Sequence, residues 1–348
     1  MATPKKTKNG KWHTQVYLGT VNGKRIIKSV TAGTKAECIF LASQLKILGG
    51  KEESHITVRQ AVESYVKSIE NVASPTSIRG YRMTLKHGFP SLMEMEVDKV
   101  TDIVMQNAIS EESKRISQYG KPLSPKTVSS RYGLIQTSLR KVCGKTFDVK
   151  LPQKIVRIKE FPMPDEIIRA IKGTDIELPC LLAMWLSLSM SEIRGLDCSS
   201  IRDGVLHIEQ VRVEGENGTI LKRTAKVDSR IRNHRLPKFL MEMINSTTTY
   251  KNYRENGENR PLIPMTRNEI YKHWKKICKK QGWEMTFHDL RAVSASVMLM
   301  LGIPDKYALQ RGGWSSDHIY KTVYQQTFDS ERRSVDDRID AYFEQFLC

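Results

Sequence analysis

The chain has 348 residues, long enough for two or three domains. It carries 56 Lys and Arg against 38 Asp and Glu, a formal charge of +18, so nucleic acid is the expected partner. A membrane surface is the rival partner, but the sequence has no apolar run of about 18 residues and no signal peptide opens it. The six cysteines form no CxxC pair, which argues against a zinc site or disulfide framework and favours a reducing cytoplasm.

Residues 1–50 form the most basic part of the chain, with nine Lys or Arg and one acidic residue. Residues 12–18 alternate like a strand, Asn22-Gly23 is a hairpin turn, and residues 25–30 form the return strand. A capping box at Thr34 predicts a helix that ends at Leu48. A two-stranded ribbon fits a DNA major groove, and a merely solubilising basic appendage is the alternative. The side chains expected to contact DNA are Lys5, Lys6, Lys11, His13, Lys24, Arg25 and Lys28.

Residues 57–150 are expected to form a helical bundle after a linker at 51–56. Helix starts are predicted at Thr57, Ser74-Pro75, Thr101 and Ser124-Pro125, where capping residues or Pro at the first helical position occur. Exposed helix faces often carry basic residues for solubility alone, which is the alternative to DNA contact. The candidate DNA-binding side chains of this bundle are Arg79, Arg82, Lys126 and Arg131.

A second linker is expected over residues 144–160, followed by the largest domain at 160–327. Residues 179–186 predict a buried helix, and short strands are expected at 205–208, at 211–213 and around Arg230–Arg232. The remainder is helical, so the chain is predicted to be multidomain and mainly α, with an α+β domain of this size.

A His, an Arg and a Tyr follow one another in the last third of the chain. His288 and Arg291 are three residues apart, so on a helix they share a face. Trp314 follows a Gly-Gly turn, and Tyr324 comes ten residues later. A guanidinium and an imidazole neutralise a phosphate, and a tyrosine hydroxyl can displace one of its esters. The alternatives are Tyr320 as the nucleophile and Trp314 as a core residue only.

This pattern resembles the second box of the tyrosine recombinases, also called the phage integrase family, which has His-x-x-Arg, then His or Trp after Gly, then the nucleophilic Tyr. The family's catalytic lysine lies in a β-hairpin and is followed by Ser-x-Arg and an aliphatic-Pro pair. Lys226, Ser229 and Leu236-Pro237 resemble that pattern, although Ser229 is followed by Arg230 and Arg232. The basic hairpin, helical bundle and large domain also resemble integrases of phages and conjugative transposons.

The family's first box, Arg-x-Ser-Glu followed by Leu, is matched by Ser191, Glu192 and Leu196, but Ser189 stands at the arginine position. A serine lacks the charge and the five-donor fork of arginine. Arg194 lies roughly 140° further around the helix and is not expected to replace it. The sequence therefore predicts an impaired or cleavage-deficient variant.

The resemblance implies a catalytic role for each of these residues. The alternatives are that Lys226 is an ordinary surface lysine and that Glu192 is an ordinary acid on a helix surface. No cofactor or metal is implied. The implied catalytic set is Tyr324 as nucleophile, Lys226 as general acid, Arg291 and His288 at the phosphate, Trp314 as an N–H donor and Glu192 as an orienting residue.

Residues 328–348 are acidic, with six acids against three arginines, and apolar residues recur at helical spacing. Such a helix either docks on its own domain or, as in members of the family, is exchanged between subunits.

The predicted function is a DNA recombinase that integrates and excises a mobile element through a 3′-phosphotyrosyl intermediate and a Holliday junction. Residues 1–50 would bind arm-type sites, and the other domains would hold core sites as a homo-tetramer, with possible DNA-bending factors and no membrane. A bacterial or phage protein in the cytoplasm, associated with the nucleoid, is expected. The alternatives are a non-catalytic architectural protein or repressor on a recombinase scaffold, and a type IB topoisomerase.

Overall fold

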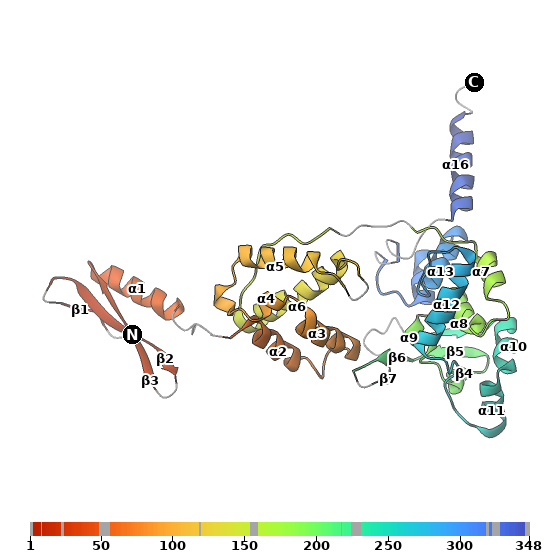
Figure 1. Cartoon of the computed structure of the whole chain (residues 1–348), viewed down its shortest axis with the longest axis horizontal. Coiled ribbons are helices and arrows are strands. Elements are labelled where there is room, and N and C mark those ends of the chain that lie inside the picture. Colours follow the sequence, from red (N-terminus) through yellow and green to blue (C-terminus); the bar gives the residue numbers. More distant parts are fainter. Residues whose placement is uncertain are drawn as a thin grey trace. The chain divides into compact units, whose positions relative to one another are not determined.

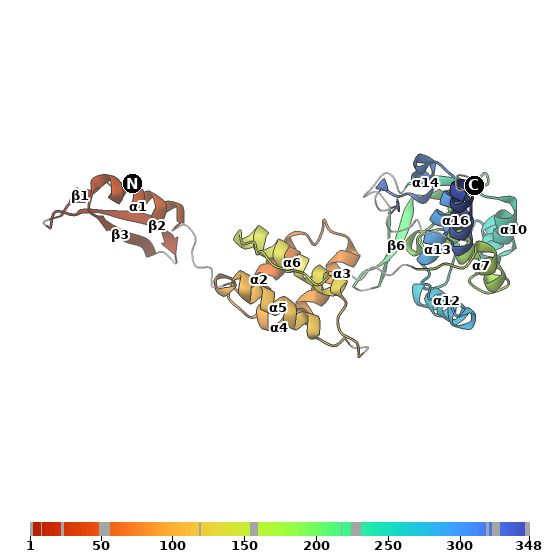
Figure 2. The same ribbon diagram turned by 90° about the horizontal axis from the view of Figure 1, so that it is seen from above.

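A computed structural model describes residues 3–7, 9–21, 24–48, 56–117, 120–153, 159–216, 218–223, 231–317, 320–321 and 328–344. The chain divides into two compact units, Met1–Lys154 and Ile155–Cys348. Both units are drawn in Figures 1 and 2, and each is described here by itself. Helices dominate and the sheets are small, which confirms the mainly α, multidomain fold that the sequence predicts.

The first unit begins with an antiparallel sheet of β1 (Lys5–Lys6), β2 (Trp12–Val21) and β3 (Lys24–Ala32). Helix α1 (Lys35–Leu48) covers one face of this sheet, because Val16, Val30, Cys38 and similar side chains form a small buried cluster between them. The two main strands and the helix are confirmed, β1 was not predicted, and the Asn22-Gly23 turn lies outside the described residues.

A helical part follows in the same unit, and every helix start predicted in it is confirmed. Thr57 and Gln60 form the expected capping box, Thr101 and Ser124 cap their helices, and Pro75 stands at the first turn of its helix. One apolar core fills the space between the helices. The elements are α2 (Val58–Ser68), α3 (Pro75–His87), α4 (Pro90–Met93), the 3-10 helix η1 (Val97–Lys99), α5 (Asp102–Lys114) and α6 (Pro125–Cys143).

Residues 144–153 lack regular structure but are attached to the helical part. Lys145 Nζ donates to Val97 O at 2.7 Å, and Lys150 N–H donates to Gln106 Oε1 at 2.8 Å. Phe147 and Val149 pack on the helical core. The start of the predicted linker is therefore part of the first unit.

The second unit is built around one large apolar core in which α13 packs against α8. Helix α13 is buried along most of its length, so it can hold a polar side chain deep inside the unit. The elements are α7 (Pro164–Ile171), α8 (Glu177–Trp185), α9 (Met190–Ile193), the 3-10 helix η2 (Cys198–Ser200), β4 (Ile201–Arg202), β5 (Val205–Ile208), β6 (Gln210–Glu214), β7 (Thr219–Arg223), β8 (Arg232–Arg235), α10 (Lys238–Ser246), α11 (Thr248–Asn256), α12 (Arg267–Gln281), α13 (Asp289–Met300), α14 (Asp305–Gly312) and α16 (Asp329–Glu344).

The strands of this unit form two small antiparallel sheets, β4-β5-β8 and β6-β7. Strands β5 and β6 and the buried helix α8 are confirmed, whereas β4 and β7 were not predicted. Their few residues alternate too briefly to give a sequence signal. The strand expected around Arg230–Arg232 begins at Arg232 in the structure, and residues 224–230 lie outside the described part.

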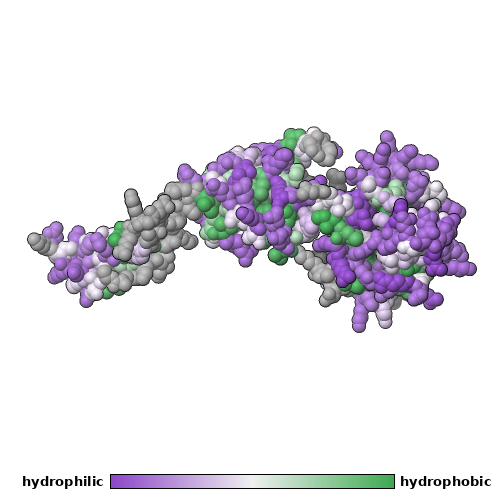
Figure 3. All heavy atoms as spheres, turned by 90° about the horizontal axis from the view of Figure 1, so that it is seen from below, coloured by the Kyte–Doolittle hydropathy of each residue, from purple (hydrophilic) through white to green (hydrophobic). Residues whose placement is uncertain are grey.

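Hydrophilic side chains cover most of the face seen in Figure 3, with hydrophobic groups in a few places. Among the residues that the structure describes, no helix is long and apolar enough to cross a membrane.

Candidate active site

Arg291 lies in the first turn of α13, where only 6% of the residue is exposed. Its Nη2 donates to Gly312 O at 2.6 Å, and its Nη1 donates to Ser187 O. The guanidinium also stacks on Trp314, with 4.7 Å from its central carbon to the ring centre. Backbone carbonyls from two distant segments thus fix a buried positive charge.

Ser187 supplies one of these carbonyls from an unusual backbone conformation. Its φ of 56° lies in the left-handed region that residues other than glycine rarely adopt. The residue is fully buried, and its hydroxyl hydrogen-bonds the hydroxyl of Ser294 on α13. Such strain is characteristic of sites where the surrounding structure enforces a functional geometry.

Glu192 on α9 is the buried counterion of the site, with 3% exposure. Arg232 holds it with two nitrogens, at 3.0 Å to Oε1 and 3.2 Å to Oε2, and Arg291 lies 3.6 Å from Oε2. Burial alone would raise the pKa of Glu192, but Arg232, Arg291 and the Ser189 N–H together bring it below its usual value. The helix-surface alternative for Glu192 is therefore wrong, because the carboxylate is an internal anion.

Ser189 is the N-cap of α9. Its N–H donates to Glu192 Oε2 at 2.7 Å, and its hydroxyl accepts from the Glu192 N–H at 3.4 Å, which completes a capping box. Position 189 thus adjoins the charged cluster, whereas its assignment as an arginine position stays a prediction. Arg194 pairs with Glu214 at 2.6 Å, as expected for a side chain on another face.

His288 immediately precedes α13 and is the N-cap residue of that helix. Burial first, and then the nearby Arg291, lower its pKa, while Asp289 acts in the opposite direction. Asp289 accepts from the Thr286 N–H at 2.7 Å and pairs with Lys159 at 2.7 Å. The imidazole is therefore mainly neutral near pH 7, a state in which one ring nitrogen can accept a proton.

Trp314 is fixed by the turn that precedes it. Gly313 adopts a φ of 64° at the end of α14, and a Cβ on Gly312 would collide with the indole ring. Trp314 is 6% exposed and lies against Arg291 and Tyr320. Tyr320 is fully buried, with its ring centre 4.9 Å from that of Trp314, so it is a core residue in this structure.

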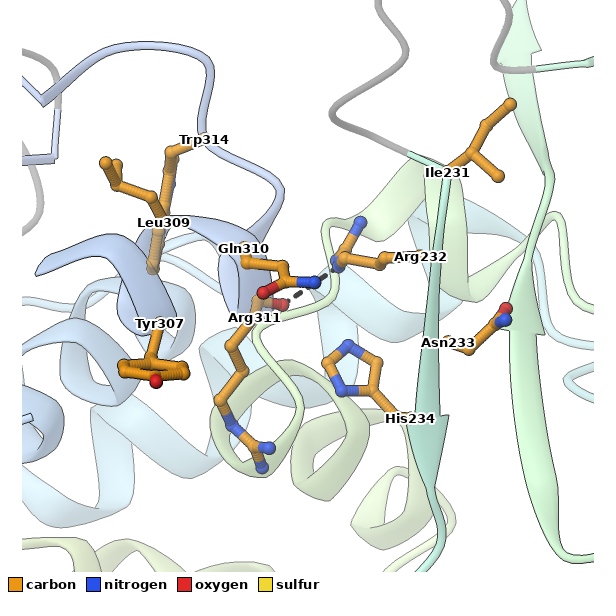
Figure 4. A pocket seen from close by; sticks show the side chains of 9 residues that line it. All are labelled: Ile231, Arg232, Asn233, His234, Tyr307, Leu309, Gln310, Arg311 and Trp314. Carbon is orange, nitrogen blue, oxygen red and sulfur yellow. Dashed lines mark hydrogen bonds between the residues drawn. The ribbon is translucent and has the colours of Figure 1, made fainter. Parts of the chain in front are cut away.

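Beside the charged cluster lies a pocket of about 860 Å³ between β8 and α14. Figure 4 shows Arg232 and His234 from β8 facing Arg311 from α14, with Arg232 Nε donating to Arg311 O at 2.9 Å. Burial, followed by Arg232 and Arg311, lowers the pKa of His234 to about 3. The pocket wall is thus formed by two arginines and a neutral histidine.

The structure brings together His288, Arg291, Trp314, Glu192 and the Ser189 position, as the sequence predicts. Lys226 and Tyr324 lie outside the described residues, so their roles remain predictions. Among the described residues, no group of three His, Cys, Asp or Glu side chains is arranged to hold a metal ion.

Sequence reasoning missed three contributors, namely Arg232, Ser187 and Lys159. Arg232 was noted only as a departure from the family pattern. Arg232 and His234 are buried, whereas Asn233 and Arg235 are exposed. That alternation is the signal that Arg232 points inward, and it requires the strand boundary to be known.

Most candidate DNA-binding side chains of the first unit are exposed, and two of them are engaged in ion pairs. Arg82 pairs with Glu70, and Arg131 pairs with Glu112, a carboxylate that is 1% exposed. The side chains of Lys24 and Arg25 lie outside the described residues. Arg131 therefore has a structural partner inside the helical part.

Comparisons with known proteins match residues 165–331 to the family described as the phage integrase family. An integrase from Saccharopolyspora erythraea is 37% identical over 81 residues, which are 23% of this chain and 18% of that protein. The integrase of Salmonella phage P22 is 26% identical over 211 residues, 56% of this chain and 53% of that protein. The chain thus spans about half or less of the length of these relatives.

Two groups of solved structures share the fold. The integrase of transposon Tn1549 with transposon right end DNA has a TM-score of 0.63 at 16% identity, over 81% of this chain and 99% of that one. A lambda integrase tetramer bound to a Holliday junction has a TM-score of 0.55 at 17% identity, over 93% of this chain and 95% of that one. At this level of identity, the likeness shows a common architecture.

Proposed function

We propose that this chain, whose residues 165–331 match the phage integrase family, is a site-specific DNA recombinase that integrates and excises a mobile element. The observation that carries the proposal is the buried cluster of Arg291, Glu192 and Trp314 with His288 beside it. These are the residues that match the family's two boxes, and they meet at one place.

The proposed reaction exchanges one phosphate ester for another. The Tyr324 oxygen bonds to the scissile phosphorus, the bond from phosphorus to the 5′-oxygen breaks, and a 3′-phosphotyrosyl ester remains. His288, which its lowered pKa keeps neutral, takes the tyrosine proton, and Lys226 gives a proton to the departing 5′-oxygen. The ester keeps the phosphoryl energy, so the reverse attack by a 5′-hydroxyl reseals DNA. Two rounds of exchange would pass through a Holliday junction.

Arg291 would hold the non-bridging oxygens of the phosphate, and the indole N–H of Trp314, whose ring stacks on that guanidinium, would be a further donor. The carbonyls of Ser187 and Gly312 prevent the guanidinium from changing its position as charge develops. Such preorganisation is a large contribution to catalysis of charge-separating reactions.

Ser189 limits cleavage in this proposal, because the phosphate lacks the guanidinium that the family carries at that position. Restoring it with Ser189→Arg should raise the rate of covalent protein–DNA adduct formation by about 10²–10³-fold. The measurement is a denaturing gel of adducts on nicked attachment-site DNA, which traps the cleaved state. An unchanged rate would show that position 189 is not the missing phosphate contact.

Tyr324→Phe in the Ser189→Arg background is the matched control, and it should form no adduct at all. The replaced arginine favours the second candidate, a non-catalytic DNA-binding protein on a recombinase scaffold. That candidate predicts specific DNA binding and no adduct even with Ser189→Arg. A type IB topoisomerase would instead relax supercoiled DNA that carries no specific site.

The first unit is proposed to bind DNA at two kinds of site. The face of the N-terminal sheet opposite α1 carries His13, Gln15 and Tyr17 on β2 and Ile27 on β3, and Tyr17 and Ile27 are half exposed. A sheet face of this size fits the major groove of an arm-type site. The helical part, residues 57–150, would contact the core site, and this activity would place the protein with the nucleoid in a bacterial cytoplasm.

Helix α16 is proposed to join subunits into a tetramer. Val335 and Ile339 on this helix are about half exposed. The second unit has an apolar pocket of about 580 Å³ lined by Ile168, Met184, Trp185, Met298 and Leu301. If α16 of one copy docks in this pocket of a second copy, the apolar face of the helix and the apolar pocket cover each other. This arrangement supports exchange of α16 between subunits.

A further inference from the structure

Arg232 and Arg291 place two guanidinium groups side by side in the second unit. Both donate to Ser187 O, and they hold successive carbonyls of the chain, Arg311 O and Gly312 O. Like charges at this proximity repel strongly when water is excluded. The Glu192 carboxylate lies between them and offsets that repulsion.

The carboxylate is shared unequally. Arg232 contacts both of its oxygens at 3.0 and 3.2 Å, whereas Arg291 lies 3.6 Å from one oxygen. Two arginines and one glutamate sum to a charge of +1 (2 − 1), and the unequal sharing leaves that charge mainly on Arg291. Without Arg232, the nearest cation to Glu192 would be Arg291, and the pair would sum to zero.

Arg232 lines the neighbouring pocket, but its guanidinium is already engaged by acceptors of the protein. Its side chain is 4% exposed, and its three nitrogens donate to Arg311 O, Glu192 and Ser187 O. Its contacts therefore point to a role exerted through Glu192.

We propose that Arg232 is a positioning residue whose guanidinium neutralises Glu192, so that Arg291 keeps its full positive charge for the scissile phosphate. This inference rests on the proposed function, because it assumes that Arg291 meets a phosphate. It also explains how a buried carboxylate is tolerated beside the phosphate-binding arginine.

The test measures how strongly the protein senses one negative charge on DNA, and it requires no cleavage. The cleavage site is first mapped by footprinting on the ends of the element. The full chain is then titrated with two core-site duplexes, one natural and one with a neutral methylphosphonate at the scissile position. The ratio of the two dissociation constants reports the charge available at that phosphate.

We expect the unaltered chain to prefer the charged duplex by about tenfold. Arg232→Gln should reduce this ratio to near one, because Glu192 then pairs with Arg291. Adding Glu192→Gln to Arg232→Gln should restore most of the preference, because the competing anion is gone. Gln at position 192 keeps an oxygen acceptor for the Ser189 N–H, so the cap of α9 is preserved.

Restoration by a second substitution separates charge balance from a structural role. A residue that merely supports the fold would not be rescued by removing its partner, so a double variant as poor as Arg232→Gln overturns the inference. An unchanged ratio in Arg232→Gln also overturns it. Arg232→Lys keeps the charge, and its ratio should lie nearer to that of the unaltered chain.

The same experiment distinguishes failure of the proposed function from failure of the role proposed for Arg232. If the unaltered chain binds no specific site, the recombinase assignment falls and this inference falls with it. If the chain discriminates the two duplexes and all variants do so equally, only the role of Arg232 is refuted.

Discussion

Ser189 caps α9, and it stands at the position where the proposed function expects a positive charge. Its hydroxyl and N–H form the capping box with Glu192, so the residue fixes the same carboxylate that Arg232 neutralises. Replacing a capping serine costs about 1 kcal/mol of folding stability. Contacts between an arginine at position 189 and the DNA phosphate would have to offset that cost. The serine is thus well suited to its local structure even where it weakens the proposed chemistry.

His234 makes stability depend on pH. Its pKa is about 3 in the folded chain, whereas an unfolded histidine titrates near pH 6.5. The unfolded state therefore binds more protons in this window, and the free energy of unfolding falls as pH drops from about 6.5 toward 3. His234→Gln removes this titration, so its unfolding free energy should fall less between about pH 7 and pH 5.

Urea unfolding followed by tryptophan fluorescence measures this slope, since four of the five tryptophans lie in the second unit. Above about pH 7 the difference in unfolding free energy between the two proteins should be constant, because His234 is neutral there in both the folded and the unfolded state. Below about pH 4.5 carboxylates such as Glu192 add the same trend, so the comparison is made above that value. Parallel curves across the whole range would contradict the prediction.

At the scale of elements, α13 and the turn after α14 carry most of the described site. Helix α13 brings Arg291 into the core, and the turn at Gly312 and Gly313 lays Trp314 on its guanidinium. Strand β8 contributes Arg232 and His234 from the opposite wall. The site therefore depends on how β8 packs against α13 and α14, two consecutive helices that lie far from it in the sequence.

Helix α6 offers a test of whether a basic residue serves DNA or the fold. Arg131 pairs with Glu112, which also holds the Phe89 N–H at 3.0 Å and Arg115 at 2.9 Å. Removing one partner of a buried carboxylate is costly, so Arg131→Met should reduce the free energy of unfolding by about 3 kcal/mol.

Lys126→Met on the same helix is the matched control, since Lys126 is exposed, and a change of only about 0.5 kcal/mol is expected. Chemical denaturation of both variants gives the comparison. If Arg131→Met is as stable as the control but binds core-site DNA less well, the sequence prediction of DNA contact is favoured over the structural role.

At the scale of the whole molecule, the two units have separate apolar cores, and each contributes a different part of the proposed activity. The net charge of +18 should make DNA binding steeply dependent on salt, because counterions are released from the phosphates. Affinity would then come largely from net charge, and the proposed chemistry from the cluster around Arg291 in the second unit.

Truncation after Phe328 tests the role of α16. Phe328 is 1% exposed and belongs to the core, so it must be retained if the remaining unit is to stay folded. The truncated chain should unfold at about the same denaturant concentration but fail to assemble on core-site DNA, as measured by sedimentation. Ile339→Asp provides a milder variant, because it places a charge on the proposed docking face. Normal assembly of both variants would show that α16 is dispensable.

The sequence by itself determined the features that depend on neighbours along the chain. The capping box at Thr57, the prolines that begin α3 and α6 and the helical pair His288 and Arg291 all act within one turn, so their spacing is enough. The family resemblance also pointed to Trp314 and Glu192, and the structure places both against Arg291.

Only the tertiary structure decided how charge is distributed in the site. Arg232 reaches Glu192 across 40 residues, and Arg291 reaches Ser187 O across 104 residues. Such pairings follow from how β8, α9 and α13 pack, and no local pattern encodes them. Burial strengthens these interactions, because little water is present to screen the charges. A carboxylate that would be an ordinary surface acid in water therefore offsets the charge of the two guanidiniums beside it.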